Sequence, residues 1–390
     1  MADRKSIETL CIHGDNHSYN EDSRAISFPI YQTASFSHIE IGHNGSGFDY
    51  TRESNPTRSH LEETLAAVEG AEDCVAFSSG MAAITACFEL FKPNDHIIIA
   101  EDLYGGVVRL IHNIEEKNGL VFEFVDTTDV EKIKAAVRKE TKAIYLETPS
   151  NPMMNVTDIS ACAEIAKEAG AYLIVDNTFM SPCFQNPIKL GADIVVHSGS
   201  KFISGHNDTI CGFVCTATSE LADRIRLIAK TVGNTLAPFD SWLAMRGLKT
   251  LAVRMERQQE NAVAIVEWLK KQDKVNKIYY IGCEDHPGYE INKKQSRGSG
   301  SMISFSVDTP ETALALLKGV KVVTFAESLG GTESLITYPI IQTHPDVPDD
   351  VKKHLGITDT LIRLSVGLEN VNDIIEDLDK ALNSYENTRC

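Results

Sequence analysis

A lysine near the middle of the chain follows an apolar segment and a turn of small residues. Ile194-Val195-Val196-His197 leads into Ser198-Gly199-Ser200, and this turn ends in Lys201. The pattern predicts a buried strand that places one amine at the end of a sheet. A second apolar segment, Tyr172-Leu173-Ile174-Val175, ends in the carboxylate of Asp176. Because ligands of open α/β sheets bind beyond the carboxyl ends of the strands, we expect Asp176 and Lys201 to face one crevice.

A lysine and a carboxylate in one crevice have the chemistry that pyridoxal 5'-phosphate (PLP) requires. The lysine forms a Schiff base with the cofactor, and the carboxylate keeps the pyridine nitrogen protonated. The turn Ser78-Ser79-Gly80-Met81 opens a predicted helix, whose first N–H groups suit a phosphate. Ser198 and Ser200 offer two hydroxyl groups to the same phosphate. Each feature is weak alone, but together they favour a PLP site.

Two further turns follow predicted strands. Tyr104 precedes Gly105 and Gly106, and its ring is expected either to stack on a flat cofactor or to close over the core. Asn151 lies between two prolines in the turn at 147–152 and presents a polar amide. The local sequence leaves both alternatives for Tyr104 open and assigns no role to Asn151 by itself.

Arg363 is a single cation inside the apolar segment 360–366, which predicts a strand. A buried arginine is costly unless it is paired, so we expect a carboxylate partner in a cleft. That partner is either a structural side chain or the α-carboxylate of an amino-acid substrate, held by the two-pronged guanidinium.

Composition and charge exclude several classes of protein. The chain has 390 residues, 43% hydrophobic and 24% charged, which is ordinary globular composition. Its formal net charge of −18 argues against nucleic acid or an anionic membrane surface as a partner. Nine cysteines without a CxxC pair indicate reduced thiols, and no metal site is assigned. No apolar run approaches the ~20 residues of a membrane span, so we expect a soluble, cytoplasmic protein.

The chain divides into three expected parts. Residues 1–56 lack sustained periodicity and predict an extended arm that another subunit holds in place. Residues 57–239 predict a large α/β domain that begins with a helix at Asn55-Pro56-Thr57. Residues 240–390 predict a smaller α+β domain, with a long helical stretch from Trp242 to Trp268 and strands at 302–307 and 320–325. The strands predicted for the large domain are 74–77, 97–100, 121–125, 143–146, 172–175, 193–196 and 212–215.

Eight ordered motifs, taken together, carry a resemblance to a known family. They are YTRESNPTR (50–58), SSGMAA (78–83), EDLYGG (101–106), ETPSNP (147–152), VDNTF (175–179), SGSK (198–201), AESLGGTESL (326–335) and RLSVGLE (363–369). The chain resembles, over nearly its whole length, the Cys/Met-metabolism family of PLP-dependent enzymes. The resemblance implies fold type I of PLP-dependent transferases, with a mostly parallel seven-stranded sheet between helices and a smaller C-terminal domain.

The resemblance also implies a role for each matched residue. Lys201 holds the cofactor, Asp176 pairs with its pyridine nitrogen, Tyr104 stacks on its ring and assists the leaving group, and Asn151 approaches its phenolic oxygen. The other implied cofactor-binding residues are Gly80, Met81, Thr178, Ser198 and Ser200 from one subunit and Tyr50 and Arg52 from its neighbour. The implied substrate-binding residues are Asn151, Glu327, Ser328, Thr343 and Arg363. A shared site makes a dimer the smallest active unit, and the family usually forms homotetramers.

The sequence favours chemistry at Cγ. Glu327 resembles the acidic residue that meets the distal amino group of cystathionine in γ-synthases and γ-lyases. We therefore expect an enzyme that forms or cleaves a C–S bond at Cγ of homoserine-derived amino acids, of the cystathionine γ-synthase or γ-lyase type. Cystathionine β-lyase and O-acetylhomoserine sulfhydrylase are the alternative activities. A PLP-binding regulator or scaffold without turnover is the alternative from another class.

Overall fold

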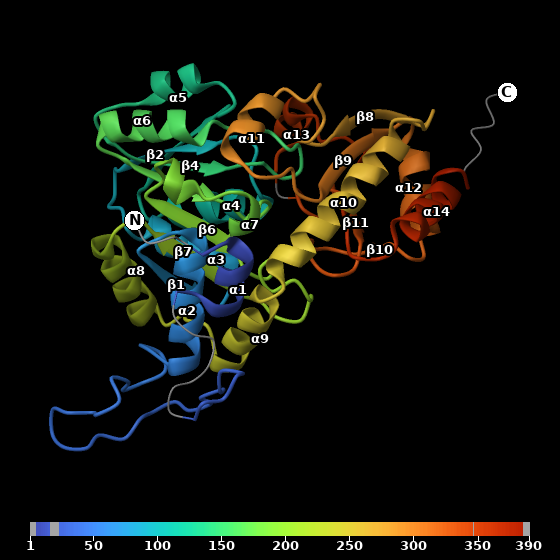
Figure 1. The fold of residues 1–390 in the computed structure, drawn as a ribbon. Coiled ribbons are helices and arrows are strands. Elements are labelled where there is room, and N and C mark those ends of the chain that lie inside the picture. The colour runs from blue at the N-terminus through green and yellow to red at the C-terminus, as the bar shows by residue number, and fades with distance from the viewer. Residues whose placement is uncertain (1–4, 16–22, 346, 385–390) are drawn as a thin grey trace.

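The structure is a computed structural model that describes residues 5–15, 23–345 and 347–384 (Figure 1). Its helices are α1 (Ile7–His13), α2 (Pro56–Glu69), α3 (Gly80–Phe88), α4 (Gly105–Leu110), the π-helix η1 (Ile111–Glu115), α5 (Val130–Ala136), α6 (Ile159–Ala169), α7 (Ser181–Phe184), the 3-10 helix η2 (Pro187–Leu190), α8 (Ser219–Val232), α9 (Pro238–Leu248), α10 (Leu251–Leu269), α11 (Tyr289–Gln295), α12 (Pro310–Gly319), α13 (Asp349–Leu355) and α14 (Val371–Leu382). Its strands are β1 (Asp73–Phe77), β2 (His96–Ala100), β3 (Val121–Val125), β4 (Thr141–Glu147), β5 (Tyr172–Asp176), β6 (Ile194–Ser198), β7 (Gly212–Thr216), β8 (Val275–Tyr279), β9 (Met302–Val307), β10 (Thr324–Phe325), β11 (Leu335–Thr337) and β12 (Leu361–Ser365).

The large sheet has seven strands in the order β1-β7-β6-β5-β4-β2-β3. Neighbouring strands from β6 to β3 are parallel, whereas β7 is antiparallel to both β1 and β6. Each of the seven predicted strands lies within two residues of an observed one. The predicted α/β class and the mostly parallel seven-stranded sheet are therefore confirmed.

Both faces of this sheet are buried, which explains why its strands are continuous apolar runs. Successive residues of β5 alternate between two cores: Leu173 and Val175 pack on one face, and Ile174 packs on the other. Helices α1, α2 and α6 contribute to the first core, and α3, α4 and α8 contribute to the second. The sheet thus lies between two helical layers (Figure 1).

The helix α2 begins where the sequence predicts. The side chain of Asn55 accepts the backbone N–H of Thr57 at 3.0 Å, and Pro56 occupies the first turn. An asparagine cap followed by proline is a typical helix start. The predicted apolar face, Leu61, Leu65 and Val68, is buried in the first core.

The C-terminal sheet has five strands in the order β10-β11-β12-β9-β8, and they are antiparallel except for β10 and β11. The long helix predicted from Trp242 to Trp268 is instead two helices, α9 and α10, which break at Lys249 and Thr250. Glycine and threonine have low helix propensity, and Gly247 is required here because a Cβ would lie 2.0 Å from the backbone oxygen of Ser204. This close approach couples the end of α9 to the turn that follows Lys201.

The strand predicted at 320–325 is also shorter than expected, because only Thr324–Phe325 pairs as β10. The backbone N–H groups of Lys321, Val322 and Val323 instead donate to the carboxylate of Asp377 on α14, at 2.8–2.9 Å. A side chain has taken the donors that a strand partner would use.

The N-terminal segment contains more structure than the expected arm. Leu10 and Cys11 of α1 are buried against α2 and α10, and residues 1–4 and 16–22 of this segment lie outside the described residues. The later part, from residue 23 to the start of α2, projects from the body (Figure 1). It carries exposed apolar side chains at Ile26, Ile39 and Ile41. Exposed apolar groups of this kind are typical of a surface that another protein covers.

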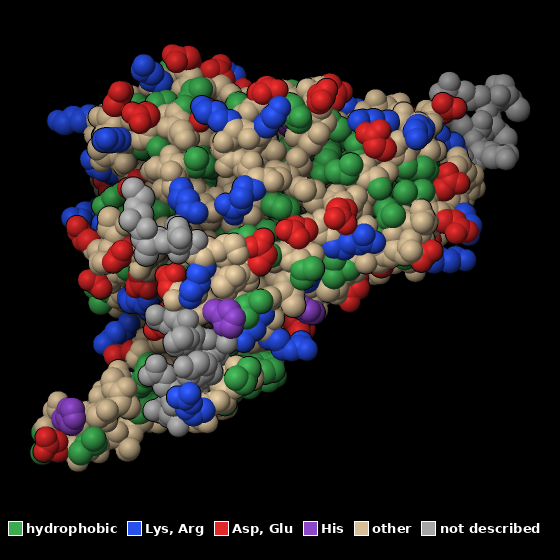
Figure 2. Space-filling view, in the orientation of Figure 1, with side chains coloured by type: hydrophobic (Ala, Val, Ile, Leu, Met, Phe, Trp, Pro, Cys, Tyr) green, Lys and Arg blue, Asp and Glu red, His purple; other side chains and the backbone are tan. Residues whose placement is uncertain are grey.

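Acidic and basic side chains are interspersed over the face displayed in Figure 2. Among the described residues, no helix has the length and apolar character needed to cross a bilayer.

Candidate active site

A cavity of about 520 Å³ lies beyond the carboxyl ends of β2, β4, β5 and β6. The C-terminal part of the chain supplies the rest of the lining, from residues 326–329 after β10, Leu335 of β11, Thr343, and Arg363 of β12. The cavity is lined by most of the predicted site residues: Gly80, Met81, Tyr104, Asn151, Asp176, Thr178, Ser198, Ser200, Lys201, Glu327, Ser328, Thr343 and Arg363. This is the position that the strand-end rule predicts for a ligand of an open α/β sheet.

Lys201 lies in the turn that follows β6. Its Nζ donates to Ser328 Oγ at 2.8 Å. Burial, and then the positive charge of Arg363, lowers the pKa of Lys201 to about 8. An amine with a lowered pKa is partly neutral near pH 7, which is the form that acts as a nucleophile and a base.

The turn that carries Lys201 is held by buried contacts. The guanidinium of Arg254, on α10, donates to the backbone oxygens of Phe202, Ile203 and Gly247 at 2.8–3.2 Å. One side chain thereby joins the lysine turn to the end of α9. The contact restricts the turn, so that the amine enters the cavity from a fixed backbone position.

Asp176 is the last residue of β5 and is buried. Its Oδ1 accepts the backbone N–H of Thr178 at 2.9 Å. Burial raises the pKa of Asp176, against the effect of the Thr178 hydrogen bonds and of His197. No described residue forms an ion pair with its carboxylate. A cation placed against it would restore the ionised form.

The start of α3 also lines the cavity, next to Ser198. Ser79 caps the helix by accepting the N–H of Ala82 at 3.0 Å, and the N–H groups of the first turn have no partner within the helix. Gly80 permits a close approach, because a Cβ there would lie 2.9 Å from Ser198 Cβ. The hydroxyl of Ser200 is engaged with the backbone of Cys211, accepting its N–H at 2.9 Å and donating to its oxygen at 3.2 Å. This end therefore offers helix N–H groups and the Ser198 hydroxyl to an anion.

Tyr104 lies between β2 and α4 with its ring half-exposed at the cavity. Its backbone N–H donates to Glu147 Oε2 at 3.0 Å. A Cβ at Gly106 would lie 2.4 Å from the Tyr104 ring, so the glycine is needed for the ring to occupy this position. Burial, and then the negative charge of Glu327, raises the pKa of the phenol, which therefore stays protonated at neutral pH.

Arg363 is only 2% exposed, yet it has no carboxylate partner among the described residues. Its guanidinium donates to Asn151 Oδ1 at 2.8 Å, to the Ser328 backbone oxygen at 3.1 Å and to Thr337 Oγ1 at 3.2 Å. Its Nε is buried without a hydrogen-bond partner. Burial lowers the pKa of Arg363 to about 10. The expected structural carboxylate is not found in the part of the chain that the structure describes, so the geometry favours the substrate carboxylate as the partner.

Tyr50 and Arg52 do not reach this cavity within the chain. They line a separate groove beside Pro238, where Arg52 lies 5.5 Å from the centre of the Tyr50 ring and donates to the Lys230 backbone oxygen. Their expected contact with a cofactor is one between subunits and stays a prediction.

Glu147 lines the cavity but is not among the predicted site residues. It is the last residue of β4, and in the large sheet it lies beside Asp176. The signal that identified Asp176, an apolar strand ending in a carboxylate, is equally present at Glu147.

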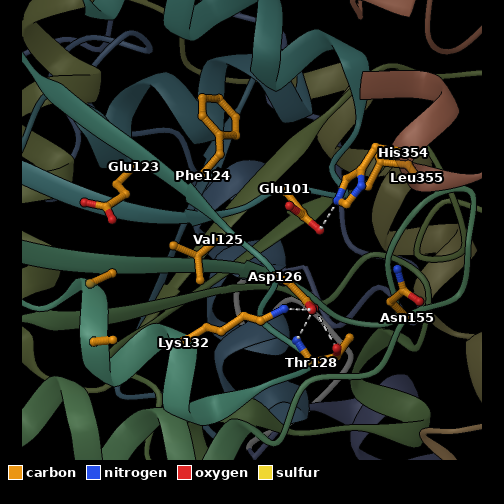
Figure 3. A pocket seen from close by; sticks show the side chains of 12 residues that line it. Glu101, Glu123, Phe124, Val125, Asp126, Thr128, Lys132, Asn155, His354 and Leu355 are labelled. Carbon is orange, nitrogen blue, oxygen red and sulfur yellow. Dashed lines mark hydrogen bonds and ion pairs between the residues drawn. The ribbon is translucent and has the colours of Figure 1, made fainter. Parts of the chain in front are cut away.

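A second, more open cavity of about 620 Å³ lies at the ends of β2 and β3 (Figure 3). Four of its charged groups form two pairs: Lys132 Nζ is 2.7 Å from Asp126 Oδ2, and His354 Nε2 is 3.4 Å from Glu101 Oε1. The remaining one, Glu123, pairs with Arg138 outside the lining. Within the described residues, no group of three or more His, Cys, Asp or Glu side chains is placed to hold a metal ion. The predicted catalytic residues line the first cavity and not this one.

Comparisons with known proteins agree with this geometry. The family model described as Cys/Met metabolism PLP-dependent enzyme matches residues 8–383. The chain is 45% identical over 375 residues to cystathionine gamma-lyase of Bacillus subtilis (strain 168), covering 96% of this chain and 98% of that protein. It is 45% identical over 377 residues to cystathionine beta-lyase of Lactococcus lactis subsp. cremoris (strain MG1363), covering 97% and 99%. It is also 45% identical over 379 residues to cystathionine gamma-synthase of Haemophilus influenzae, covering 97% and 98%.

A solved structure supports the same assignment. Cystathionine gamma-lyase from Lactobacillus plantarum, complexed with L-serine, matches with a TM-score of 0.94 and 43% identity, covering 97% of this chain and 99% of that one. The chain therefore belongs to the family of Cys/Met metabolism PLP-dependent enzymes, and the predicted resemblance is confirmed.

The cofactor of this family is PLP, and the residues of the first cavity fit it. Lys201 supplies the amine for covalent attachment, and the buried carboxylate of Asp176, which lacks an ion-pair partner among the described residues, suits a protonated pyridine nitrogen. The start of α3 with Ser198 would hold the phosphate, and Tyr104, whose ring lines the cavity, would stack on the cofactor. The predicted cofactor is thereby confirmed.

Proposed function

We propose that the chain is a trans-sulfuration enzyme acting at Cγ of homoserine-derived amino acids, as a cystathionine γ-synthase or a cystathionine γ-lyase. The observation that carries the proposal is the charge arrangement of the cavity, which contains Lys201, Arg363 and Glu327. Arg363 has an unused Nε–H, and no described residue pairs with the Glu327 carboxylate. A cation and an anion without ion-pair partners in one cavity suit an amino acid with a carboxylate at one end and an ammonium group at the other.

The residues of the chain have separate tasks in this proposal. Bound PLP withdraws electrons from the substrate Cα. Lys201 removes the Cα proton and returns a proton later, because its pKa of about 8 allows both forms near neutral pH. Tyr104 stays protonated and donates a hydrogen bond to the departing group. Chemistry at Cγ also requires removal of a proton at Cβ, a second task for Lys201, whereas chemistry at Cβ requires only expulsion of the substituent.

A substrate panel tests the proposed activity. Purified protein with PLP is given cystathionine, or O-acetylhomoserine or O-succinylhomoserine with cysteine as the thiol. We expect 2-oxobutyrate from cystathionine, cystathionine from an acylated homoserine, or both. Pyruvate as the main product from cystathionine would instead establish the β-lyase activity, which the 45% identity to a β-lyase keeps as the second candidate. Binding of PLP without turnover of any substrate would establish a regulator or scaffold.

Replacement of Glu327 by Gln tests the contact with the distal ammonium group. Hydrogen bonds to charged groups contribute about 1.5–3 kcal/mol, so we expect kcat/KM for cystathionine to fall about tenfold to a hundredfold. O-acetylhomoserine lacks this ammonium group, and its kcat/KM is expected to change much less. The matched control is Glu311→Gln, which makes the same change at an exposed position on α12. An equal loss for both substrates in Glu327→Gln would contradict the assignment of Glu327 to the distal end.

We also propose that Tyr50 and Arg52 complete the site of a neighbouring subunit, within a cytoplasmic homotetramer built from two active dimers. Two observations support this proposal. Tyr50 and Arg52 do not line the first cavity of their own chain, and the segment that carries them projects from the body with exposed apolar side chains (Figure 1). The division into an arm (1–56), a PLP-binding domain (57–239) and a C-terminal domain (240–390) belongs to this proposal.

A complementation experiment tests the shared site. Arg52→Ala is expected to weaken retention of PLP, and Lys201→Ala is expected to be inactive. A mixed dimer of the two contains one site with both residues intact, so activity should reappear after subunit exchange. Mass spectrometry of tagged subunits checks that exchange has occurred. No recovery in verified mixed dimers would show that Arg52 acts within its own subunit or has no role in the site.

A further inference from the structure

Glu147 has no task in the function proposed above, although it lies in the centre of the site. It ends β4, is buried, and lines the same cavity as Lys201. In the parallel pairing of β4 with β5, Glu147 is the direct neighbour of Asp176. Paired residues of adjacent strands have side chains on the same face and within contact distance. Two buried carboxyl groups are therefore side by side at the end of the sheet.

The surroundings of Asp176 stabilise an ionised carboxylate more than those of Glu147 do. Asp176 accepts the Thr178 N–H at 2.9 Å and is stabilised as an anion by His197. Glu147 accepts the Tyr104 N–H at 3.0 Å and is also stabilised by the backbone N–H of Asn151, but no described residue forms an ion pair with it. Among the described groups with the largest effects on its pKa there is no cation, whereas His197 is such a group for Asp176. Burial, and then the charge of Asp176, raises the pKa of Glu147 well above its ordinary value of 4.5. The groups that face it are Asp176 on β5, Asp102 and Tyr104 from the turn after β2, Tyr145 on β4 and Arg363 on β12.

The hydrogen bond from the Tyr104 N–H lets Glu147 hold the turn between β2 and α4 in place. Tyr104 immediately precedes α4, and its ring position depends on the turn between β2 and that helix. The Glu147 carboxyl is the acceptor that ties the backbone of this turn to the end of β4. A neutral carboxyl has the acceptor oxygen that this contact requires and adds no second negative charge beside Asp176.

We propose that Glu147 is a positioning residue that functions as a neutral carboxyl: it anchors the turn beneath Tyr104 and leaves Asp176 as the ionised member of the pair. The inference rests on the proposed function, because the tasks of Tyr104 and Asp176 come from it. A neutral carboxyl and an amide have similar shape and hydrogen-bonding capacity, so glutamine is the conservative replacement at this position and leucine removes the acceptor.

Kinetic measurements with the two variants test the positioning role. We expect Glu147→Gln to keep kcat within about fivefold of the wild type, because the amide oxygen replaces the acceptor. We expect Glu147→Leu to lose about tenfold to a hundredfold in kcat, because the Tyr104 N–H is left without its partner and the ring loses its position. If glutamine is as damaging as leucine, an ionised carboxylate is required and the proposal is wrong. A leucine variant as active as the wild type would equally overturn it.

Thermal unfolding tests the protonation state without reference to activity, with PLP saturating throughout. In the unfolded chain Glu147 ionises near its ordinary pKa of 4.5, whereas in the fold its pKa is raised. The stability contributed by this group is therefore fully present below the unfolded pKa and is lost as pH rises through the folded pKa. Glutamine cannot lose a proton, so the Tm of Glu147→Gln relative to the wild type should increase from about pH 5 to about pH 8.

A matched control is Glu140→Gln, which makes the same change at an exposed position just before β4. Its Tm difference from the wild type should stay constant over the same pH range. A constant difference for Glu147→Gln as well would show that Glu147 is ionised throughout and would overturn the proposal. The unfolding result stands even if no trans-sulfuration substrate is turned over, and it stands if the leucine variant fails to fold.

Discussion

Replacement of Lys201 by Ala is expected to abolish turnover, with a loss of at least about 10²–10⁴-fold in kcat, which is the contribution of a positioned acid–base group alone. The loss of covalent attachment of PLP adds to this effect. No other lysine lines the cavity among the described residues, so no neighbouring amine can replace it. The measurements are 2-oxobutyrate formation and the visible absorbance of the lysine-bound cofactor, which should disappear together.

The control for this variant is Lys277→Ala, which removes an exposed lysine on β8 and should leave both measurements unchanged. The apo-protein offers a second check. Because burial and the charge of Arg363 lower the pKa of Lys201 to about 8, the neutral fraction of the amine rises through that pH and approaches its maximum above it. The rate of PLP uptake should therefore rise with pH and level off above about 8. Full activity and unchanged absorbance in Lys201→Ala would disprove the assignment.

Replacement of Arg363 by Leu is expected to have the second largest effect. Loss of one partner of a buried, hydrogen-bonded charge pair costs about 2–5 kcal/mol, which corresponds to about 30-fold to several thousandfold in kcat/KM. Lysine at this position keeps the charge but not the two-pronged geometry, so Arg363→Lys should recover only part of the loss. PLP retention should change much less than kcat/KM, because Arg363 has no direct hydrogen bond to Lys201 or α3 and acts on that end of the cavity only through Asn151 and Ser328.

A substrate analogue isolates the carboxylate contact. Cystathionine whose reacting carboxylate is converted to an amide should be a poor substrate of the wild type, and Arg363→Leu should make it little worse. The two changes remove the same interaction, so their effects should not add. Additive losses would mean that Arg363 acts on something other than the substrate carboxylate, for example by holding Asn151 in place.

The large sheet was predictable because its strands are buried on both faces. Val195 and Val196 belong to different cores, so neither position tolerates a polar residue and the strand is visible as an unbroken apolar run. The C-terminal strand at 320–325 was not predictable in the same way. Its donors at Lys321, Val322 and Val323 bond to Asp377, more than fifty residues away, and local propensity contains no information about that contact.

The break between α9 and α10 has a similar origin. The periodicity from Trp242 to Trp268 is helical throughout, and the break at Lys249 and Thr250 becomes intelligible only once Gly247 is seen against the turn after Lys201. Helix propensity is a weak preference that tertiary contacts override.

The sequence by itself determined the class of fold, the cofactor and most of the residues that line the first cavity, because strand-end side chains such as Asp176 and Lys201 follow from strand positions. Only the tertiary structure decided which of these residues meet. Lys201 contacts Ser328 across 127 residues, and Glu147 lies beside Asp176 because β4 and β5 are neighbours in the sheet. Strand order and the packing of one sheet against another are properties of the whole chain. Contacts that depend on them cannot be derived from local pattern or spacing. The same holds for the lack of an ion-pair partner at Arg363 and at Glu147 among the described residues.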